Sequence, residues 1–208
     1  MDKEYKILEY TKSAKGNLIS LCALSSAKNQ TLVIGVVHGD EYQGEILIDK
    51  YMSEIKKENV LFIPCLNPDG RDLKTRTNSN GVDINRNFPT ENWILSDKDN
   101  YYGGENPSSE IETQFVINVI EKYKPKSIIT LHTPYKIVNY DGPAKELAGM
   151  ISKIIKYPVE ESVGYTTPGS FGTWAGVERN VPIITLEMDE EESIENLYKP
   201  IKTIFNNL

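Results

Sequence analysis

Short apolar runs alternate with amphipathic segments along most of the chain, and this alternation constrains the fold more than any other sequence feature. Residues 32–37 are apolar throughout, as in a central strand covered on both faces. Residues 42–57 instead place apolar side chains at helical spacing. Ser109 and Glu112 have the spacing of a capping box, so we expect a helix to begin at Ser109 and to end before Pro125. The alternation predicts an α/β fold with a largely parallel sheet. The expected strands are 17–24, 32–37, 60–65, 127–131 and 181–186, and the further helices are 144–155 and 193–207.

One long segment, residues 66–108, interrupts this alternation and has hardly any periodic signal. A loop of this length inside a domain usually carries function. Between residues 71 and 86 it has the four basic side chains Arg71, Lys74, Arg76 and Arg86 against two acidic ones, in a chain of net charge −7. This local reversal of sign predicts an anion-binding loop.

The chain has two histidines, and each follows an apolar run that we expect to be a strand. Ligands of open α/β sheets bind beyond the carboxyl ends of the strands, where His38 and His132 would meet. Glu41 follows His38 by three residues, so both side chains can face the same way. Two imidazoles and one carboxylate, with a fourth position open, are typical of a catalytic zinc site.

A hydrolytic zinc site also needs a base and a cationic group near the reacting carbonyl. Glu187 directly follows the apolar run 181–186, and we favour it as the base over the acidic cluster 189–192, which we expect to be a solvated turn. Arginine suits a substrate carboxylate because its planar fork can bind in a bidentate manner. Spacing alone does not choose among Arg71, Arg76 and Arg86.

Length and composition exclude several classes of protein. A chain of 208 residues predicts one domain, residues 1–208. The net negative charge argues against nucleic acid as a partner.

No apolar run approaches the roughly 20 residues of a membrane span, and the first residues lack the apolar core of a signal peptide, so we expect no membrane partner and a cytoplasmic location. Cys22 and Cys65 lie in apolar stretches and do not form a CxxC pair, so we expect two buried thiols. The oligomeric state is left open, with a homodimer as one option.

Several strings in the chain resemble the zinc metallocarboxypeptidases of the carboxypeptidase A type. The strings are HGDE at 38–41, NPDG at 67–70, NGVDINRNFP at 80–89 and LE at 186–187. NPSSEIETQ at 106–114 and SVGYTTPGSFGTW at 162–174 narrow the resemblance to a small bacterial branch that acts on murein peptides. The resemblance implies a mixed, mostly parallel twisted sheet sandwiched between helices. It also implies cleavage of the bond between γ-D-glutamate and meso-diaminopimelate in small acidic peptides released by cell-wall turnover.

The same resemblance implies roles for individual residues. His38, Glu41 and His132 match the ligands of one zinc ion, and Glu187 matches the general base. Arg76 resembles the arginine that polarises the scissile carbonyl.

Three further residues match the substrate contacts of the family. Asn85 and Arg86 match the pair that holds the terminal carboxylate, and Tyr165, nine residues before Trp174, resembles the mobile substrate-binding tyrosine.

One departure from the family pattern narrows the choice of substrate. Digestive carboxypeptidases carry arginine between the zinc-binding histidine and glutamate, whereas this chain has Asp40. The change argues against trimming of ordinary protein C-termini. Two alternatives remain: a zinc carboxypeptidase acting on other C-terminal residues, and a zinc deacylase of N-acyl amino acids similar to aspartoacylase or succinylglutamate desuccinylase. A binding module with a decayed site is a third option, which the full set of ligands and base disfavours.

Overall fold

The structure, a computed structural model, describes residues 4–24, 30–161 and 167–208. Its centre is an eight-stranded sheet in the order β1-β2-β4-β3-β5-β8-β6-β7. The strands are β1 (Lys6–Lys12), β2 (Leu18–Ala23), β3 (Thr31–Ile34), β4 (Val60–Ile63), β5 (Ser127–His132), β6 (Ile137–Asp141), β7 (Val159–Glu160) and β8 (Ile183–Glu187). The helices are α1 (Gln43–Glu54), α2 (Pro68–Leu73), α3 (Ile111–Tyr123), α4 (Lys145–Ile155) and α5 (Ile194–Asn206), with a 3-10 turn η1 (Ile84–Arg86) and a π-helix η2 (Gly172–Val177).

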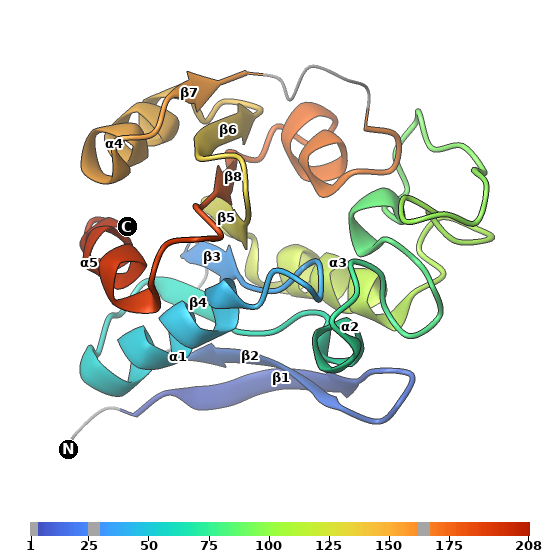
Figure 1. Ribbon diagram of the computed structural model, residues 1–208, viewed down its shortest axis with the longest axis horizontal. Coiled ribbons are helices and arrows are strands. Elements are labelled where there is room, and N and C mark those ends of the chain that lie inside the picture. The colour runs from blue at the N-terminus through green and yellow to red at the C-terminus, as the bar shows by residue number, and fades with distance from the viewer. Residues whose placement is uncertain (1–3, 25–29, 162–166) are drawn as a thin grey trace.

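The four central strands β4, β3, β5 and β8 are parallel, whereas β2 joins β4 and β6 joins β8 in antiparallel fashion. The sheet is therefore mixed and mostly parallel at its centre, as expected. In Figure 1, α1, α4 and α5 cover one face of the sheet, while α3 and η2 cover the other. The fully buried strands β3, β4 and β5 explain why the central runs are apolar at every position.

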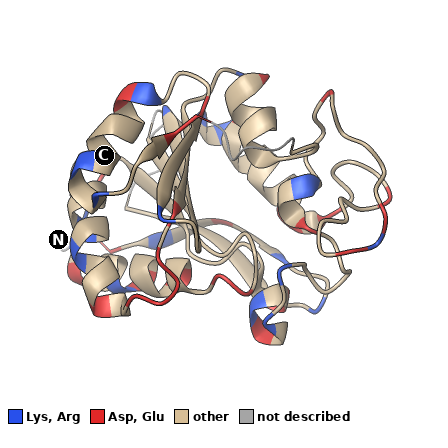
Figure 2. Cartoon of the chain, turned by 45° about the horizontal axis from the view of Figure 1, so that its top comes forward, with Lys and Arg blue, Asp and Glu red and all other residues tan. Residues whose placement is uncertain are grey.

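Each face of the sheet has its own apolar core. Leu47, Tyr51, Phe62 and Phe205 belong to the core under α1 and α5. Phe88, Phe115 and Trp174 belong to the core under α3 and η2. The outer faces of the helices carry interspersed Lys, Arg, Asp and Glu side chains (Figure 2), as for solvated surfaces. No helix in the described ranges combines the length and the apolar character that a membrane crossing requires.

Several expected boundaries were wrong. The strand at 32–37 ends at Ile34, because Val36 has a φ of 54° and turns the chain out of the sheet. Helix α3 begins at Ile111 with Glu110 as N-cap, and no side chain caps it. The expected capping box fails because the Ser109 hydroxyl donates to Glu110 and accepts from Asn87 instead.

Three strands were not predicted, and each lacks a continuous apolar run. β1 is an edge strand with mostly exposed or half-buried residues, β6 has the mixed sequence IVNYD, and β7 is two exposed residues long. The long segment 66–108 contains α2 and η1 but is otherwise irregular. Asn87 holds it together by donating to the carbonyl oxygens of Gly103 and Asn106, at 2.8 and 3.1 Å.

Candidate active site

His38 and Glu41 lie on the connection between β3 and α1. The connection passes so close to α2 that a Cβ atom at Gly39 would lie 2.0 Å from the carbonyl carbon of Gly70. Only glycine fits this approach. The Glu41 N–H donates to the His38 carbonyl at 3.2 Å, which closes a tight turn and keeps both side chains on the same side.

His132 and Glu187 are the last residues of two neighbouring parallel strands. They are direct partners in the register of β5 and β8. The Met188 N–H extends the pairing by donating to the His132 carbonyl at 2.7 Å. Sheet hydrogen bonding thus brings both side chains to the carboxyl edge, where His38 and Glu41 also lie.

The ligand atoms of His38, Glu41 and His132 lie within 4.8 Å of one another. His38 Nδ1 lies 2.7 Å from one carboxylate oxygen of Glu41, and His132 Nδ1 lies 2.8 Å from the other. The two Nδ1 atoms are 3.3 Å apart, and all three side chains are buried. Two imidazole nitrogens and a carboxylate that converge in this way fit the ligand set of a catalytic zinc ion.

Asp83 supports the cluster from behind, with Oδ1 3.4 Å from Nε2 of His38. A carboxylate at the second ring nitrogen favours a proton there and directs the lone pair of Nδ1 into the cluster. Burial lowers the pKa of His38, but Glu41 and Asp83 outweigh it and raise that pKa to about 9, so a metal cation at Nδ1 would displace a proton from this ring. Burial opposes ionisation of Glu41, yet the two histidines lower its pKa overall. The cluster therefore contains a charged carboxylate, as zinc requires.

Arg76 reaches the cluster from the long segment. Its Nε donates to Asp83 Oδ2 at 3.0 Å, while Nη1 lies 3.4 Å from His38 Nδ1 and 3.9 Å from a Glu41 oxygen. Burial lowers the pKa of Arg76, but Asp83 and Glu41 raise it overall, so the guanidinium stays charged. The Tyr101 ring lies 5.0 Å from the guanidinium carbon and covers it.

Asn85 and Arg86 lie in η1, on the other side of the same opening. The Asn85 side-chain oxygen accepts the N–H of Phe171 at 2.9 Å, which ties η1 to the segment before η2. Arg86 Nη1 donates to the Asn85 carbonyl at 2.7 Å, and the side chain is buried. Within the described parts of the chain its remaining N–H groups have no hydrogen-bond acceptor, so they could bind an anion.

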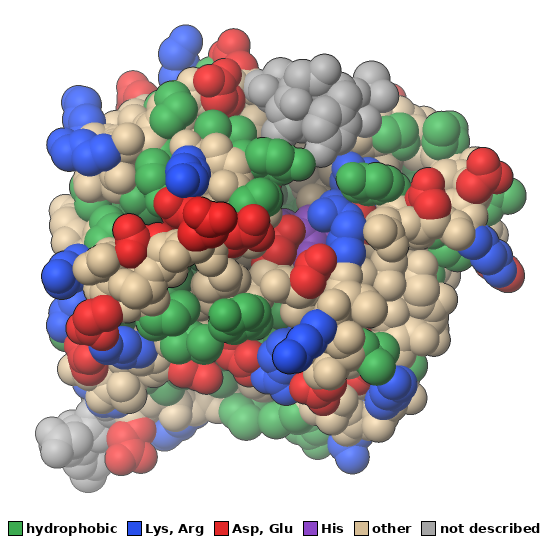
Figure 3. Space-filling view, viewed as in Figure 1, with side chains coloured by type: hydrophobic (Ala, Val, Ile, Leu, Met, Phe, Trp, Pro, Cys, Tyr) green, Lys and Arg blue, Asp and Glu red, His purple; other side chains and the backbone are tan. Residues whose placement is uncertain are grey.

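These residues surround one cavity of about 340 Å³. Histidine is visible at the bottom of the hollow, between acidic side chains on one side and basic ones on the other (Figure 3). Glu187 lines the cavity and is 8% exposed, and its Oε2 has no hydrogen-bond partner within the described part of the chain. Burial raises the pKa of Glu187. A buried carboxylate with a raised pKa is suited to accept a proton.

The structure brings together most of the residues singled out from the sequence. His38, Glu41, Arg76, Asn85, Arg86 and Glu187 line the cavity, and His132 belongs to the cluster at its base. Tyr165 lies outside the described residues. Trp174 is buried in the core under η2, against Phe88 and Phe171.

One expectation about charged groups was wrong. Arg71 does not reach the cavity, because it is paired with Glu45 and Asp72 on another part of the surface. The expected anion-binding loop is thus reduced to Arg76 and Arg86. The acidic cluster 189–192 forms the mostly exposed turn that we expected, and Glu190 in addition lines the cavity.

Several residues of the site were not predicted from the sequence. Asp83 had been counted only as a charge, although it lies inside the NGVDINRNFP string and contacts both His38 and Arg76. Asn139, Asp141 and Thr185 also line the cavity. Asn139 and Asp141 were missed because β6 was not predicted.

Comparisons with known proteins agree with this geometry. The zinc carboxypeptidase family matches residues 3–206. Murein peptide amidase A of Escherichia coli K12 is 31% identical over 207 residues, covering 92% of this chain and 84% of the relative, and the Vibrio campbellii protein of that name is 32% identical over 86% and 77%. The crystal structure of murein-tripeptide amidase from Escherichia coli O157 superposes with a TM-score of 0.87 at 26% identity, covering 100% of this chain and 92% of the other. Carboxypeptidase A from Helicoverpa armigera, at 16% identity, covers 99% and 67% with a TM-score of 0.77 and shares the fold.

Proposed function

The chain belongs to the zinc carboxypeptidase family, and from that premise we propose that this hydrolase releases meso-diaminopimelate from short murein peptides by cleaving the γ-D-glutamyl bond. The observation that carries the proposal is the shared cavity, in which Arg76 and Arg86 face the His38–Glu41–His132 cluster and Glu187. The names of relatives that are 31–32% identical over most of the chain support the choice of substrate. We propose residues 1–208 as one peptidase domain.

We propose that His38, Glu41 and His132 hold one zinc ion per chain. A zinc ion bound there supplies a Lewis acid for the scissile carbonyl and lowers the pKa of a bound water. Asp83 would hold the His38 ring in place through its second nitrogen.

Glu187 is the proposed general base. Its unpartnered Oε2 would take a proton from the attacking water and deliver it to the amine of the leaving diaminopimelate. Its burial supports this role, because burial raises the pKa of the carboxyl toward the neutral range in which both transfers occur.

The cationic side chains have separate proposed roles. Arg76 lies within 4 Å of the cluster and would stabilise the negative charge that develops on the carbonyl oxygen. Asn85 and Arg86 would bind the carboxylate next to the scissile bond, Arg86 through the N–H groups that no described residue accepts from. Tyr165 remains a proposed substrate contact.

Charge supports a small acidic peptide as substrate. Such a peptide carries one carboxylate on γ-D-glutamate and two on diaminopimelate, and Arg76 and Arg86 supply positive charge inside the cavity of an acidic protein. Asp40, in the position where digestive relatives have arginine, lines the same cavity and disfavours an ordinary peptide backbone.

The test compares three substrates of the zinc-loaded protein by mass spectrometry. They are L-Ala-γ-D-Glu-meso-diaminopimelate, a hippuryl peptide and an N-acyl amino acid such as N-acetylaspartate. We expect release of free diaminopimelate from the first at a rate far above the other two. Preferred cleavage of the hippuryl peptide would indicate a general carboxypeptidase, and preferred cleavage of the acyl amino acid would indicate a deacylase.

A further inference from the structure

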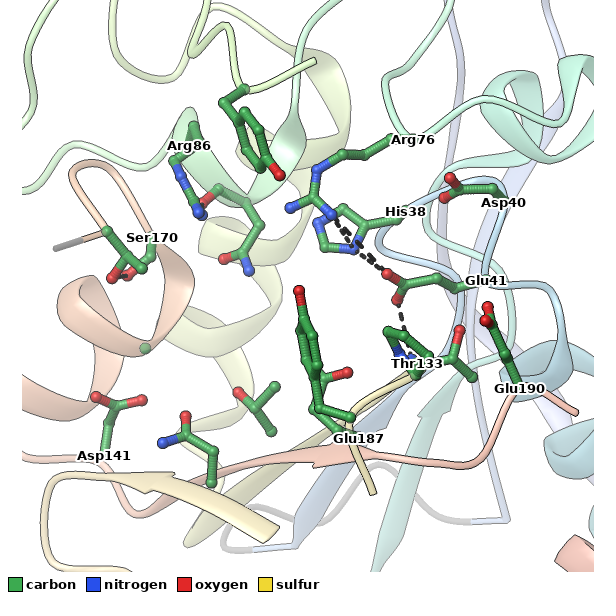
Figure 4. Close-up of a pocket in the computed structure, with 18 of the residues that line it drawn as sticks. His38, Asp40, Glu41, Arg76, Arg86, Thr133, Asp141, Ser170, Glu187 and Glu190 are labelled. Carbon is green, nitrogen blue, oxygen red and sulfur yellow. Dashed lines mark hydrogen bonds and ion pairs between the residues drawn. The ribbon is translucent and has the colours of Figure 1, made fainter. Parts of the chain in front are cut away.

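Tyr101 contacts both of the arginines that line the cavity. Its ring centroid lies 5.0 Å from the guanidinium carbon of Arg76 and 5.8 Å from that of Arg86. Both guanidinium groups approach the cavity from the side opposite Glu187 (Figure 4). Tyr101 lines the cavity as well, and 52% of the residue is exposed. One aromatic ring therefore serves two cations to which the proposed reaction gives different roles.

The turn that carries this ring is anchored to the residue that also holds Arg76. The carboxylate of Asp83 accepts from Nε of Arg76 at 3.0 Å, and the N–H of Asp83 donates to the Tyr102 carbonyl at 2.8 Å. The Tyr101 N–H donates to a side-chain oxygen of Asp99 at 2.7 Å, and Tyr102 is buried. The backbone thus fixes where the Tyr101 ring lies relative to the guanidinium of Arg76.

Arg86 is held differently from Arg76. Arg76 forms an ion pair with Asp83, whereas no acidic group in the described part of the chain forms one with Arg86, which donates to the Asn85 carbonyl. A carboxylate beside Arg86 would neutralise it and would compete with an anionic substrate. An aromatic face attracts a guanidinium without adding net negative charge, and it leaves the N–H groups at the edge of the guanidinium open. The ring of Tyr101 can therefore hold Arg86 while Arg86 stays available to an anion.

We propose that Tyr101 is a positioning residue, which holds the guanidinium groups of Arg76 and Arg86 so that one substrate reaches both. The proposal rests on the proposed function, because it takes the reacting carbonyl to Arg76 and the substrate carboxylate to Arg86. The negative potential of the ring face is the active property, and the phenol hydroxyl is dispensable. Loss of the ring face should therefore affect turnover and substrate binding together.

Substitutions at residue 101 separate the ring face from its size and from the hydroxyl. The variants are Tyr101→Phe, Tyr101→Leu and Tyr101→3,4,5-trifluorophenylalanine. The fluorinated ring has nearly the shape of phenylalanine, but fluorine withdraws electron density from the face and removes its attraction for cations. Tyr10→Leu is the control, because Tyr10 is an exposed tyrosine on β1 that does not line the cavity. The constants kcat and KM are measured with whichever of the three test substrates is cleaved, since each has a carboxylate on its leaving amino acid.

We expect Tyr101→Leu and the fluorinated variant to lose about 5- to 30-fold in kcat/KM, as for two exposed cation–π contacts. The loss should be shared between a lower kcat, through Arg76, and a higher KM, through Arg86. Tyr101→Phe and Tyr10→Leu should keep the wild-type constants. A fluorinated variant as active as Tyr101→Phe would show that the ring acts through its shape, and would overturn the proposal.

Relaxation of the ¹⁵N-labelled arginine side chains tests the positioning without any substrate. The order parameter of the Arg86 Nε–H group should fall in Tyr101→Leu and in the fluorinated variant. That of Arg179 should stay unchanged, because its guanidinium carbon lies 4.2 Å from the ring centroid of Trp174 instead. An Arg86 order parameter that stays at the wild-type value in both variants would contradict the proposal. If the tripeptide is not cleaved but the order parameter falls, the proposed substrate is wrong and the role of Tyr101 stands.

Discussion

Two groups of residues meet in the cavity, and they are held there in different ways. The strand-end group consists of His38, Glu41, His132 and Glu187, which follow or end the parallel strands β3, β5 and β8. The loop group consists of Arg76, Asn85 and Arg86, which come from the irregular segment 66–108.

Backbone pairing holds the first group, whereas side-chain hydrogen bonds hold the second. His132 and Glu187 are register partners in the sheet. Arg76 instead depends on Asp83, and Asn85 depends on the N–H of Phe171. Substitution in the strand-end group should therefore remove a chemical function and leave the fold intact. Substitution of Asn85 or Arg86 should mainly weaken substrate binding, whereas substitution of Arg76 should mainly lower kcat.

The largest effect is expected for His132→Ala. This change removes one of the three proposed ligands, so zinc binding and hydrolysis should disappear together, while the circular dichroism spectrum stays that of wild type. Zinc content after dialysis, measured by plasma mass spectrometry, checks the result. Undiminished zinc in the variant would place the metal elsewhere.

Glu187→Gln should separate metal binding from turnover. Glutamine has nearly the same shape but cannot take a proton, so kcat should fall about 10²- to 10⁴-fold at full zinc content. Glu190→Gln is the matched control, because Glu190 lines the same cavity without contacting the cluster. Near-normal turnover of zinc-loaded Glu187→Gln would remove this residue from the mechanism.

The difference between the two groups also explains how far the sequence could be interpreted. The apolar runs predicted β3, β5 and β8. Ligands of such sheets bind beyond the carboxyl ends of the strands, so His38, His132 and Glu187 could be assigned to the site from the sequence. The partners of the loop group could not be predicted, because no periodic pattern encodes the contact of Asp83 with Arg76.

The edges of the sheet were missed for a related reason. β6 has no apolar run of its own, and its pairing with β8 depends on contacts distant in sequence. Asp141 was missed with it. Spacing did not separate Arg71 from Arg86, and only the family resemblance did, because the physical difference is the pairing of Arg71 with Glu45.

Glu112 lies in α3 and contacts Asn78 of the long segment 66–108. Glu112→Gln should change the pH dependence of the free energy of unfolding. Burial, together with Glu110 and Asp69, raises the pKa of Glu112 to about 7 from 4.5, although Asn78 donates to it. The folded protein keeps this proton up to about pH 7, whereas the unfolded chain releases it near pH 4.5. The free energy of unfolding should therefore fall by about 3 kcal/mol over that interval.

Urea denaturation at pH 5 and pH 8 measures this loss. Glutamine stays neutral, so Glu112→Gln should lack the loss and be the more stable protein at pH 8. Glu121→Gln, on the exposed side of the same helix, should behave as wild type. A wild-type pH dependence in Glu112→Gln would show that another group is responsible.

Arg86→Ala should have the smallest of these effects on catalysis. Loss of a charged hydrogen bond to the substrate carboxylate should lower kcat/KM about 10- to 100-fold, mainly through KM. Arg71→Ala, in the same segment but paired with Glu45, should leave both constants unchanged. A tripeptide amidated at that carboxylate should be cleaved equally by wild type and Arg86→Ala, and an unequal effect would give Arg86 another role.

The central claim is that His38, Glu41 and His132 of the strand-end group bind a catalytic zinc ion. X-ray absorption spectroscopy at the zinc edge of the loaded protein tests it most directly. We predict two imidazole nitrogens and oxygen ligands at about 2.0–2.1 Å, with no sulfur. A shell that contains sulfur at about 2.3 Å, or one without imidazole, would contradict the claim.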